Sequence, residues 1–347
     1  MKVEFSAAQI AAMLGGKVEG DPEAMVHNVA RIEDGAPGML SFLSNPKYIH
    51  YLYNTASSIV LVNEDFEPTE QVKTTMIRVK DAYESFAQLL AIYQEYTSNK
   101  VGIADEAFIS PDAEYGTNCY IGEFAYIGER VKIGDNVKIY PLSYIGDDVV
   151  IGDNTVIYAG VKLYAMTHIG KNCIVHSGAV LGADGFGFAP QPDGTYKKIP
   201  QIGNVLVGDN VEIGANTTID RSTMESTKIH NGVKLDNLIQ IAHNVEVGEN
   251  TAMAAQVGIS GSTHVGKNCI IAGQAGLSGH LVVADRTVIG PQAGLTKGVS
   301  EAGKQIIGSP AYDYSKFMKD VVRQRSIDKL EARISELEKK LADLLSK

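Results

Sequence analysis

The sequence has few cysteines, no long apolar run and no excess of positive charge. Cys119, Cys173 and Cys269 lack CxxC spacing, which argues against a zinc site or a disulfide framework. No apolar stretch reaches the roughly 18 residues of a membrane span, and polar residues interrupt the N-terminal segment. We therefore expect a cytoplasmic protein without a signal peptide. The net charge of -10 disfavours nucleic acid as a general partner.

What the sequence has instead is a repeat of six residues. Aliphatic residues recur at every sixth position from Ile103 to Leu181, with Tyr115 as the exception, and apolar residues recur in the same way from Ile229 to Leu295. Neither a helix nor an alternating strand has a strict period of six. Three such sides per coil predict a triangular parallel β-helix with the aliphatic residues inside. Glycine often follows the aliphatic residue, where we expect positive φ near a corner.

The cysteines and two insertions fit this frame. Each cysteine lies four residues after the start of a repeat, so one inward-facing position holds all three, and this favours a structural role over a nucleophile. The six-residue repeat is interrupted by two insertions, from about 183 to 204 and from 221 to 228. Insertions in solenoids often line binding sites. The first insertion begins with GADGFG, which is not a P-loop; a plain turn and a functional loop both stay open.

The repeat divides the chain into residues 1–100, 101–308 and 309–347. In the first region, SAAQIAAMLGG predicts a helix capped by Ser6, SSIVLV a strand and AYESFAQLLAIYQEY an amphipathic helix, which together indicate a small α/β domain. In the last region, apolar residues from Ile327 to Leu344 alternate spacings of three and four, which is a heptad seam. A helix packed on its own subunit and a helix bundle between subunits both fit this seam.

The register of the repeats brings two candidate catalytic groups together. His243 and Gly261 each lie two residues after an aliphatic position and are one full coil apart. Gly279 continues the row, and His280 lies one step beyond it. An imidazole beside a glycine N–H would supply a general base and an oxyanion donor. Three-histidine zinc spacing is absent from the sequence, so we expect no metal.

In the first region, Phe42, Asn45 and Tyr48 are three residues apart, and at helical spacing they would share a face. Packing in the core and recognition of a nucleotide base are both compatible with this pattern.

Several segments resemble a known family. GADGFGF, KIPQIGNVLVGDNVEIGANTTIDR, DNLIQIAHNVEVG, GISGS, SGHL and the N-terminal SFLSNPKY resemble the UDP-3-O-(3-hydroxyacyl)glucosamine N-acyltransferases of lipid A biosynthesis. The resemblance covers nearly the whole chain, and one departure is DRS at 220–222 in place of DRG. It implies a left-handed β-helix and a homotrimer with active sites between subunits. It also implies transfer of a 3-hydroxyacyl group from the phosphopantetheine of acyl carrier protein to the 2-amino group of UDP-3-O-acyl-glucosamine, without a permanently bound cofactor.

The resemblance also implies residue roles. His243 matches the general base, Gly261 the oxyanion donor and His280 a second active-site histidine. The uridine contacts are matched by Phe42, Asn45 and Tyr48, and the residues expected near the same site are Asp236 and Asn237.

A basic segment before the heptad seam is a candidate contact for the acidic carrier protein. Its residues are Lys316, Lys319, Arg323 and Arg325. A solvated helix face explains this segment equally well.

Two rival functions are weighed against this one. A UDP-N-acetylglucosamine O-acyltransferase would share the β-helix and a catalytic histidine but would lack the first hundred residues. A non-catalytic scaffold would be expected to have a featureless repeat rather than one interrupted at GADGFG.

Overall fold

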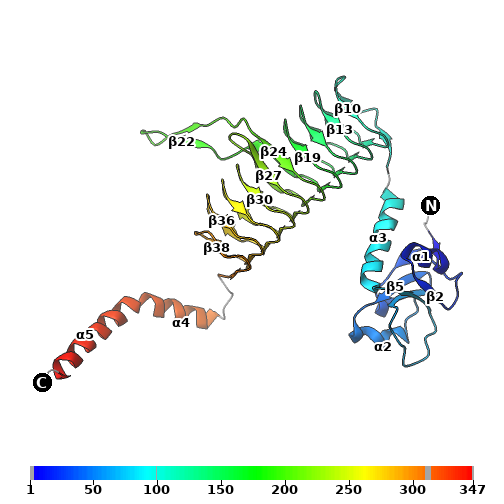
Figure 1. Cartoon of the computed structure of the whole chain (residues 1–347), viewed down its shortest axis with the longest axis horizontal. Helices are drawn as coiled ribbons and strands as arrows, with labels where there is room; N and C mark the ends of the chain where they lie inside the picture. The colour runs from blue at the N-terminus through cyan, green and yellow to red at the C-terminus, as the bar shows by residue number, and fades with distance from the viewer. Residues whose placement is uncertain (1–3, 99, 309–313, 346–347) are drawn as a thin grey trace. The chain divides into compact units, whose positions relative to one another are not determined.

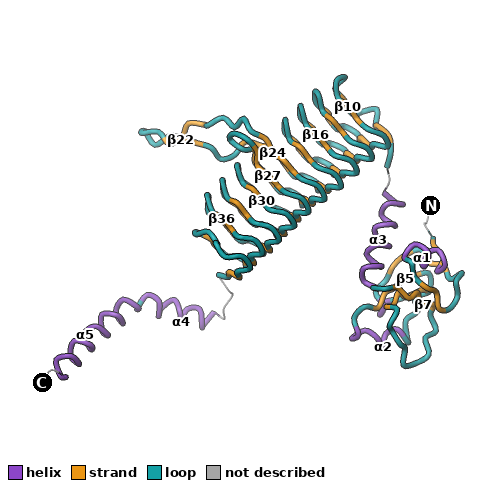
Figure 2. Tube along the Cα trace, viewed as in Figure 1, coloured by secondary structure: helices purple, strands orange, loops and turns teal. Residues whose placement is uncertain are grey.

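The computed structural model describes residues 4–98, 100–308 and 314–345 of the chain. They form two compact units, residues 1–100 and 101–347, and each is described by itself. Figure 1 labels their helices and strands, and Figure 2 distinguishes helix, strand and loop.

The first unit is a small α/β domain. Its sheet has the order β2-β7-β6-β5-β4, comprising Lys17–Glu19, Thr75–Val79, Ile59–Asn63, Met39–Leu43 and Asn28–Val29, and a separate pair joins β1 (Phe5–Ser6) to β3 (Met25–Val26). The helices are α1 (Ala7–Leu14), α2 (Ile49–Leu52) and α3 (Ala82–Ser98), with single turns η1 (Ile32–Asp34) and η2 (Pro46–Tyr48). Ser6 and Gln9 form a capping box and Gly15 ends α1 in the left-handed region, which confirms the predicted helix.

The second unit contains a triangular solenoid with three parallel faces. The first face comprises β8 (Gly102–Ile103), β11 (Tyr120–Ile121), β14 (Lys138–Ile139), β17 (Val156–Ile157), β20 (Ile174–Val175), β25 (Glu212–Ile213), β28 (Lys234–Leu235), β31 (Ala252–Met253), β34 (Ile270–Ile271), β37 (Val288–Ile289) and β39 (Gln305–Ile306). The second comprises β9 (Phe108–Ile109), β12 (Tyr126–Ile127), β15 (Tyr144–Ile145), β18 (Lys162–Leu163), β21 (Val180–Asp184), β26 (Thr218–Arg221), β29 (Gln240–Ile241), β32 (Gly258–Ile259), β35 (Gly276–Leu277) and β38 (Gly294–Leu295). The third comprises β10 (Glu114–Tyr115), β13 (Lys132–Ile133), β16 (Val150–Ile151), β19 (His168–Ile169), β24 (Asn204–Val207), β27 (Ser226–Ile229), β30 (Glu246–Val247), β33 (His264–Val265) and β36 (Val282–Val283).

The repeat explains the core. Ile121 pairs with Ile139, and Ile241 with Ile259, so the aliphatic residue of one coil stacks on that of the next. These side chains form one continuous buried cluster along the solenoid. The three cysteines lie in the same cluster, as predicted for a small inward-facing position. Burial of this apolar column is the main force that holds the coils together.

The predicted conformation of the glycines is wrong. Positive φ occurs at the third residue after the aliphatic one, where asparagine is frequent, for example at Asn118, Asn136 and Asn154. Glycine directly after the aliphatic residue is required for another reason: the adjacent coil leaves no room there for a Cβ. A Cβ on Gly134 would lie 2.3 Å from Asp153 Oδ1 and 2.7 Å from its backbone nitrogen. The coils therefore approach too closely at this point for a side chain.

The first insertion forms a hairpin that projects from the solenoid (Figure 1). It pairs β22 (Phe188–Pro190) with β23 (Tyr196–Lys198) in antiparallel register. The chain then returns to the third face at β24, and the second insertion lies between β26 and β27.

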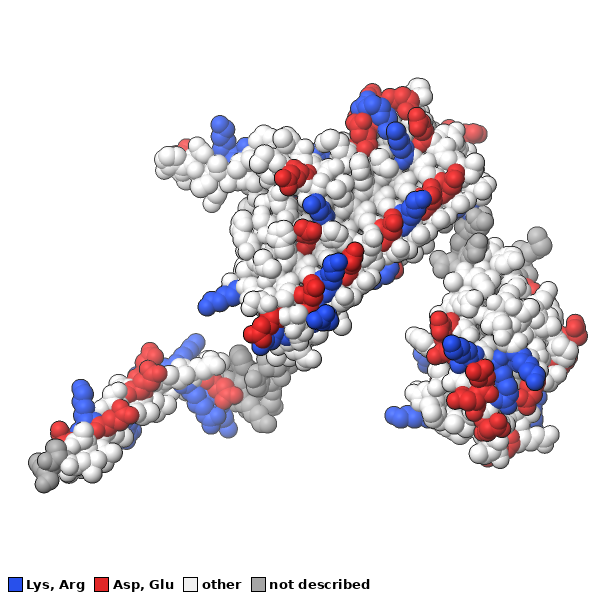
Figure 3. All heavy atoms as spheres, viewed as in Figure 1, with Lys and Arg blue, Asp and Glu red and all other residues white. Residues whose placement is uncertain are grey.

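Two helices follow the solenoid in the sequence, α4 (Tyr314–Arg325) and α5 (Ile327–Leu345). The seam residues Leu330, Ile334, Leu337 and Leu341 are all more than half exposed, so a packing partner on the same chain is not seen for them among the described residues. In the view of Figure 3, charges of both signs lie in rows along the solenoid, with wide uncharged surface between them.

Candidate active site

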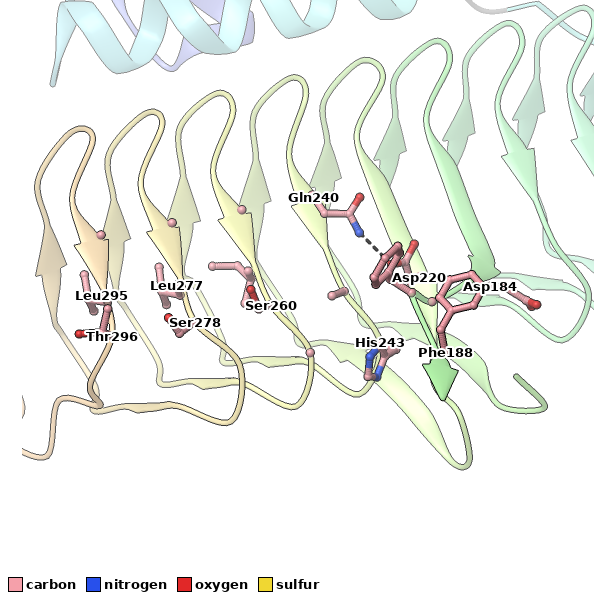
Figure 4. A pocket seen from close by; sticks show the side chains of 18 of the residues that line it. Asp184, Phe188, Asp220, Gln240, His243, Ser260, Leu277, Ser278, Leu295 and Thr296 are labelled. Atoms are coloured by element: carbon pink, nitrogen blue, oxygen red, sulfur yellow. Dashed lines mark hydrogen bonds between the residues drawn. The ribbon is translucent and has the colours of Figure 1, made fainter. Parts of the chain in front are cut away.

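A cleft of about 1000 Å³ lies on the second face of the solenoid, toward its C-terminal end. Its floor consists of outward-facing residues of β26, β29, β32, β35 and β38, and its wall is the start of the first insertion. Figure 4 shows the labelled residues on successive coils. The polar groups of the cleft gather at one end, around His243, while the other end is lined by small residues.

His243 lies at the polar end between two glycines. A Cβ on Gly261 would be 2.7 Å from His243 Cε1 and 2.8 Å from Nε2, so the ring lies directly over this glycine. A Cβ on Gly185 would be 2.7 Å from His243 Cβ. The predicted stacking of His243 on Gly261 is confirmed. The GADGFG segment forms part of the site, because Gly185 has no side chain and the loop can pack directly against His243.

The N–H groups of His243 and Gly261 differ from those of the coils in which a side chain caps the backbone. At seven other occurrences of this repeat position, the N–H donates to a carboxylate or amide Oδ1 of the next coil. These pairs are Thr117–Asp135, Glu129–Asp147, Asp135–Asp153, Lys171–Asp209, Asp209–Asn231, Ala215–Asn237 and Lys267–Asp285. The next residues above His243 and Gly261 are Gly261 and Gly279, which have no side chain. Among the described residues no acceptor takes either N–H, so both are available to an anionic oxygen in the cleft.

His280 lies beside this row rather than in it. Its N–H donates to the Gly261 carbonyl oxygen at 3.0 Å, and its φ of 60° places it at the corner of the next coil. Its side chain is exposed and is not among the residues that line the cleft. The structure thus brings His280 close to Gly261, but one step further round the corner than His243.

Asp220 is a polar residue of the cleft that the sequence did not single out. Its Oδ2 accepts a 2.8 Å hydrogen bond from Gln240 Nε2, and Gln240 Oε1 contacts Thr218 Oγ1. Burial raises the pKa of the Asp220 carboxyl to about 6, against the opposing effects of Gln240 and the nearby His243. Across the cleft, Asp184 pairs with Lys198 at 3.0 Å. The sequence feature that could have identified Asp220 is its position directly after the aliphatic residue Ile219, on the strand that pairs with β29.

The other end of the cleft is a groove with two rows of small residues. Gly258, Gly276 and Gly294 occupy equivalent positions on three successive strands, and a Cβ on any of them would meet no atom within 4 Å. Beside them run the hydroxyls of Ser260, Ser278 and Thr296 (Figure 4). The groove therefore offers an uninterrupted channel that leads away from His243.

The three residues predicted to share a helical face in the first unit do not lie on a helix. Phe42 is on β5, Asn45 caps η2 by accepting from the Lys47 N–H, and Tyr48 ends that turn. Phe42 stacks on Phe86 with ring centroids 4.4 Å apart, and Tyr48 is 44% exposed. The spacing argument is wrong because Pro46 starts a separate turn after the strand. Their uridine-binding role stays a prediction.

Asp236 and Asn237 line a different depression, on the first face of the solenoid. Asn237 Oδ1 accepts from the Ala215 N–H, and Asp236 accepts from the N–H groups of Asn237 and Ala255. Within one chain they do not reach the cleft of His243. A shared site would require the first face of a second copy.

Of the four basic residues proposed to contact a carrier, Lys319, Arg323 and Arg325 are exposed on α4. Arg323 forms an ion pair with Asp320 at 3.0 Å. The side chain of Lys316 lies outside the described residues.

Within the described residues, no group of three potential metal ligands comes together. In the same part of the chain, no helix is both long and apolar enough to cross a membrane.

A parallel β-helix of six-residue repeats with a histidine in an open cleft defines a transferase of the hexapeptide class. Residues 112–147, 130–165 and 148–183 match the bacterial transferase hexapeptide profile. Residues 23–92 match the family described as UDP-3-O-(3-hydroxymyristoyl) glucosamine N-acyltransferase, LpxD.

Relatives of the chain extend this match to its full length. The UDP-3-O-acylglucosamine N-acyltransferase of Cytophaga hutchinsonii is 55% identical over 343 residues, which cover 99% of this chain and 98% of that protein. The enzyme of the same description from Bacteroides thetaiotaomicron is 58% identical over 259 residues, or 75% of each chain. The chain belongs to the UDP-3-O-acylglucosamine N-acyltransferases, and this is its activity.

A solved structure supports the fold. The UDP-N-acetylglucosamine acyltransferase of Arabidopsis matches with a TM-score of 0.50 and 24% identity, over 60% of this chain and 71% of that one. The chain has the left-handed β-helix of this fold, as the resemblance implied.

Proposed function

We propose that the acyl group arrives as a thioester on acyl carrier protein and passes directly to the 2-amino group of the sugar, with His243 as general base. The observation that supports this most is the position of His243, whose ring lies over Gly261 where two N–H groups have no acceptor. The imidazole would remove the proton of the attacking amine. The free N–H groups would hold the oxyanion of the tetrahedral intermediate. Collapse of the intermediate would break the C–S bond, and the departing phosphopantetheine thiolate would take up the proton from the His243 imidazolium.

The reaction needs no enzyme nucleophile, because a neutral amine attacks a thioester readily. The three cysteines are poor candidates for such a role. Burial raises the pKa of the thiols of Cys119, Cys173 and Cys269, which disfavours the reactive thiolate. All three side chains also point into the core rather than into the cleft.

The groove beside His243 suits the acyl chain. Three glycines at equivalent positions leave open space along the groove, which an extended hydrocarbon chain would fill. The hydroxyls of Ser260, Ser278 and Thr296 border this channel and would accept or donate hydrogen bonds to polar groups of the donor.

We also propose a homotrimer in which each site lies between two subunits. Two observations support it. The exposed apolar seam of α5 would be buried in a helix bundle. Asp236 and Asn237 would reach the cleft only from a neighbouring copy. In this arrangement Phe42, Asn45 and Tyr48 of the first unit would bind the uridine, and Lys319, Arg323 and Arg325 would contact the carrier.

The test of the base is His243→Ala, assayed with acyl carrier protein donor and UDP-3-O-acyl-glucosamine. Base catalysis of this kind is worth roughly 10²–10⁴ in rate, so kcat should fall by that factor while the fold is retained. Near wild-type turnover of the purified variant would contradict the assignment. A covalent acyl-enzyme isolated on any cysteine would contradict direct transfer.

The carrier contact is tested separately by Arg323→Glu, with Lys339→Glu on α5 as the matched control. The first change should raise the KM for the carrier and leave the KM for the sugar nucleotide unchanged. An equal effect of both changes would remove the case for a carrier site on α4.

A further inference from the structure

The corner that follows His243 is held by a small hydrogen-bond network. Asn244 has a φ of 61°, a conformation that asparagine tolerates better than most residues. Its Oδ1 lies 3.1 Å from His243 Nδ1, and its backbone N–H donates to Thr227 Oγ1 at 2.9 Å. The histidine ring is thus held at Nδ1 by the residue that follows it.

Two backbone groups determine which way the Asn244 amide points. The Thr223 N–H lies 3.2 Å from Oδ1 and is only a donor, so the atom that it meets must be the amide oxygen. The Met224 carbonyl lies 3.3 Å from Nδ2 and is only an acceptor, so the atom there must be the amide nitrogen. A reversed amide would place donor against donor and acceptor against acceptor.

Ser222 strengthens the same orientation. Its side chain is fully buried, and its Oγ accepts from Asn244 Nδ2 at 2.6 Å. The Ser222 hydroxyl donates its own proton to the Met224 carbonyl oxygen, so toward Asn244 it is an acceptor. Ser222 is the residue at which this chain departs from the DRG of the family that it resembles.

The tautomer of His243 follows from this orientation. Because Asn244 Oδ1 faces Nδ1, that nitrogen must carry the proton, and Nε2 is left with its lone pair above Gly261. We propose that Asn244 and Ser222 are positioning residues that hold His243 as a neutral imidazole with Nε2 as the basic atom. The proposal rests on the proposed role of His243 as general base.

An amide suits this task better than a carboxylate. A carboxylate at Nδ1 would stabilise the imidazolium and raise the pKa of the histidine, which would leave less free base near neutral pH. The charged and titratable groups nearest to the ring come from several elements. They are Asp220 and Arg221 of β26, Asp184 and Lys198 of the first insertion and His280 of the next coil.

The decisive experiment is the pH profile of kcat/KM for Asn244→Asp in the full-length enzyme. Aspartate tolerates positive φ and still accepts from Nδ1, and the Ser222 hydroxyl can rotate to donate to the oxygen that replaces Nδ2, so activity at high pH should stay within about threefold of wild type. The acid side of the profile should move upward by about one pH unit. The neighbouring charged groups and the substrate amine are the same in both proteins, so they do not contribute to this difference.

Three further variants complete the test. Ser222→Ala should lower kcat about fivefold without changing the KM for the sugar nucleotide or the acid side of the profile. Asn244→Gly, which fits a φ of 61°, should fold and lose about tenfold in kcat. Asn268→Asp is the matched control, because Asn268 is exposed at the same repeat position on another corner. It should change neither quantity.

The outcomes distinguish the positioning role of Asn244 and Ser222 from the role of His243 as general base. If His243→Ala keeps wild-type turnover, the general base itself is wrong. If His243→Ala is inactive but Asn244→Asp leaves the acid side unmoved, only the positioning role is wrong. Full kcat in Ser222→Ala would remove Ser222 from the network and leave Asn244 alone in the role.

Discussion

Replacing Asp220 by asparagine should stabilise the solenoid at neutral pH and have little effect in acid. The carboxyl lies against β29, and burial raises its pKa from 3.8 to about 6. A raised pKa means that the folded state binds the proton more tightly than the unfolded state. The stability that depends on this carboxyl is therefore fully present below about pH 4 and is lost as the pH rises to about 6.

The size of the effect follows from the shift. Two pKa units correspond to about 3 kcal/mol, which is an upper limit because the cleft is open to solvent. Asparagine keeps an acceptor for Gln240 Nε2, so the hydrogen bond at this position survives the change. The variant should thus be more stable than wild type by up to about 3 kcal/mol at about pH 7 and by almost nothing at about pH 4.

Urea denaturation midpoints measured across this pH range test the prediction. Asp153→Asn is a control of opposite sense, because the hydrogen bond from Lys171 Nζ holds the pKa of Asp153 below its usual value. Asp153→Asn should lower the free energy of unfolding at pH values above the ordinary carboxyl pKa. The difference from wild type should disappear as the pH falls below the pKa of Asp153. A constant difference between wild type and Asp220→Asn at every pH would refute the reasoning.

Other changes test the site and the assembly. Gly261→Ala should fold but lose about 10² in kcat, because its Cβ would displace the ring of His243 from its place beside the N–H groups that would hold the oxyanion; wild-type kcat would contradict the stacking. In Gly276→Val and Gly294→Val the new side chain would extend into the open groove and block it. In an assay with mixed acyl donors, both variants should therefore prefer shorter acyl chains. The block at Gly276 should shorten the preferred chain by about four carbons more, since coils are about 4.8 Å apart. Leu337→Glu should lower the helical signal in circular dichroism, because a solitary helix of this length is marginal; an unchanged signal would argue against a bundle.

The core could be predicted from the sequence because one rule governs it. A period of six leaves one inward position on each side of every coil, and residues such as Ile121 and Leu277 are buried accordingly. The same rule places Gly261 above His243. The corner conformation was missed, although the recurrence of Asn118, Asn136 and Asn154 at one position was a visible signal.

The rest of the site depends on loops that periodicity does not describe. Gly185 and Ser222 lie in or beside the insertions, and their contacts with His243 and Asn244 depend on the path of those loops. Asp220 precedes an insertion, so its distance along the chain from β29 no longer equals one regular coil. Only three-dimensional register across the insertions brings these residues to one cleft.

The site lies where two successive coils have no side chain that caps the backbone N–H of the preceding coil. In several coils a carboxylate or amide side chain accepts the backbone N–H of the preceding coil, so that N–H is not available to a ligand. Gly261 and Gly279 remove two such side chains in succession. This change makes room for the imidazole of His243 and leaves two N–H groups facing the cleft. Water in the open cleft can solvate these donors before substrate binds, so their exposure costs little stability. The proposed catalytic centre thus depends on the absence of side chains at Gly261 and Gly279 as much as on the presence of His243.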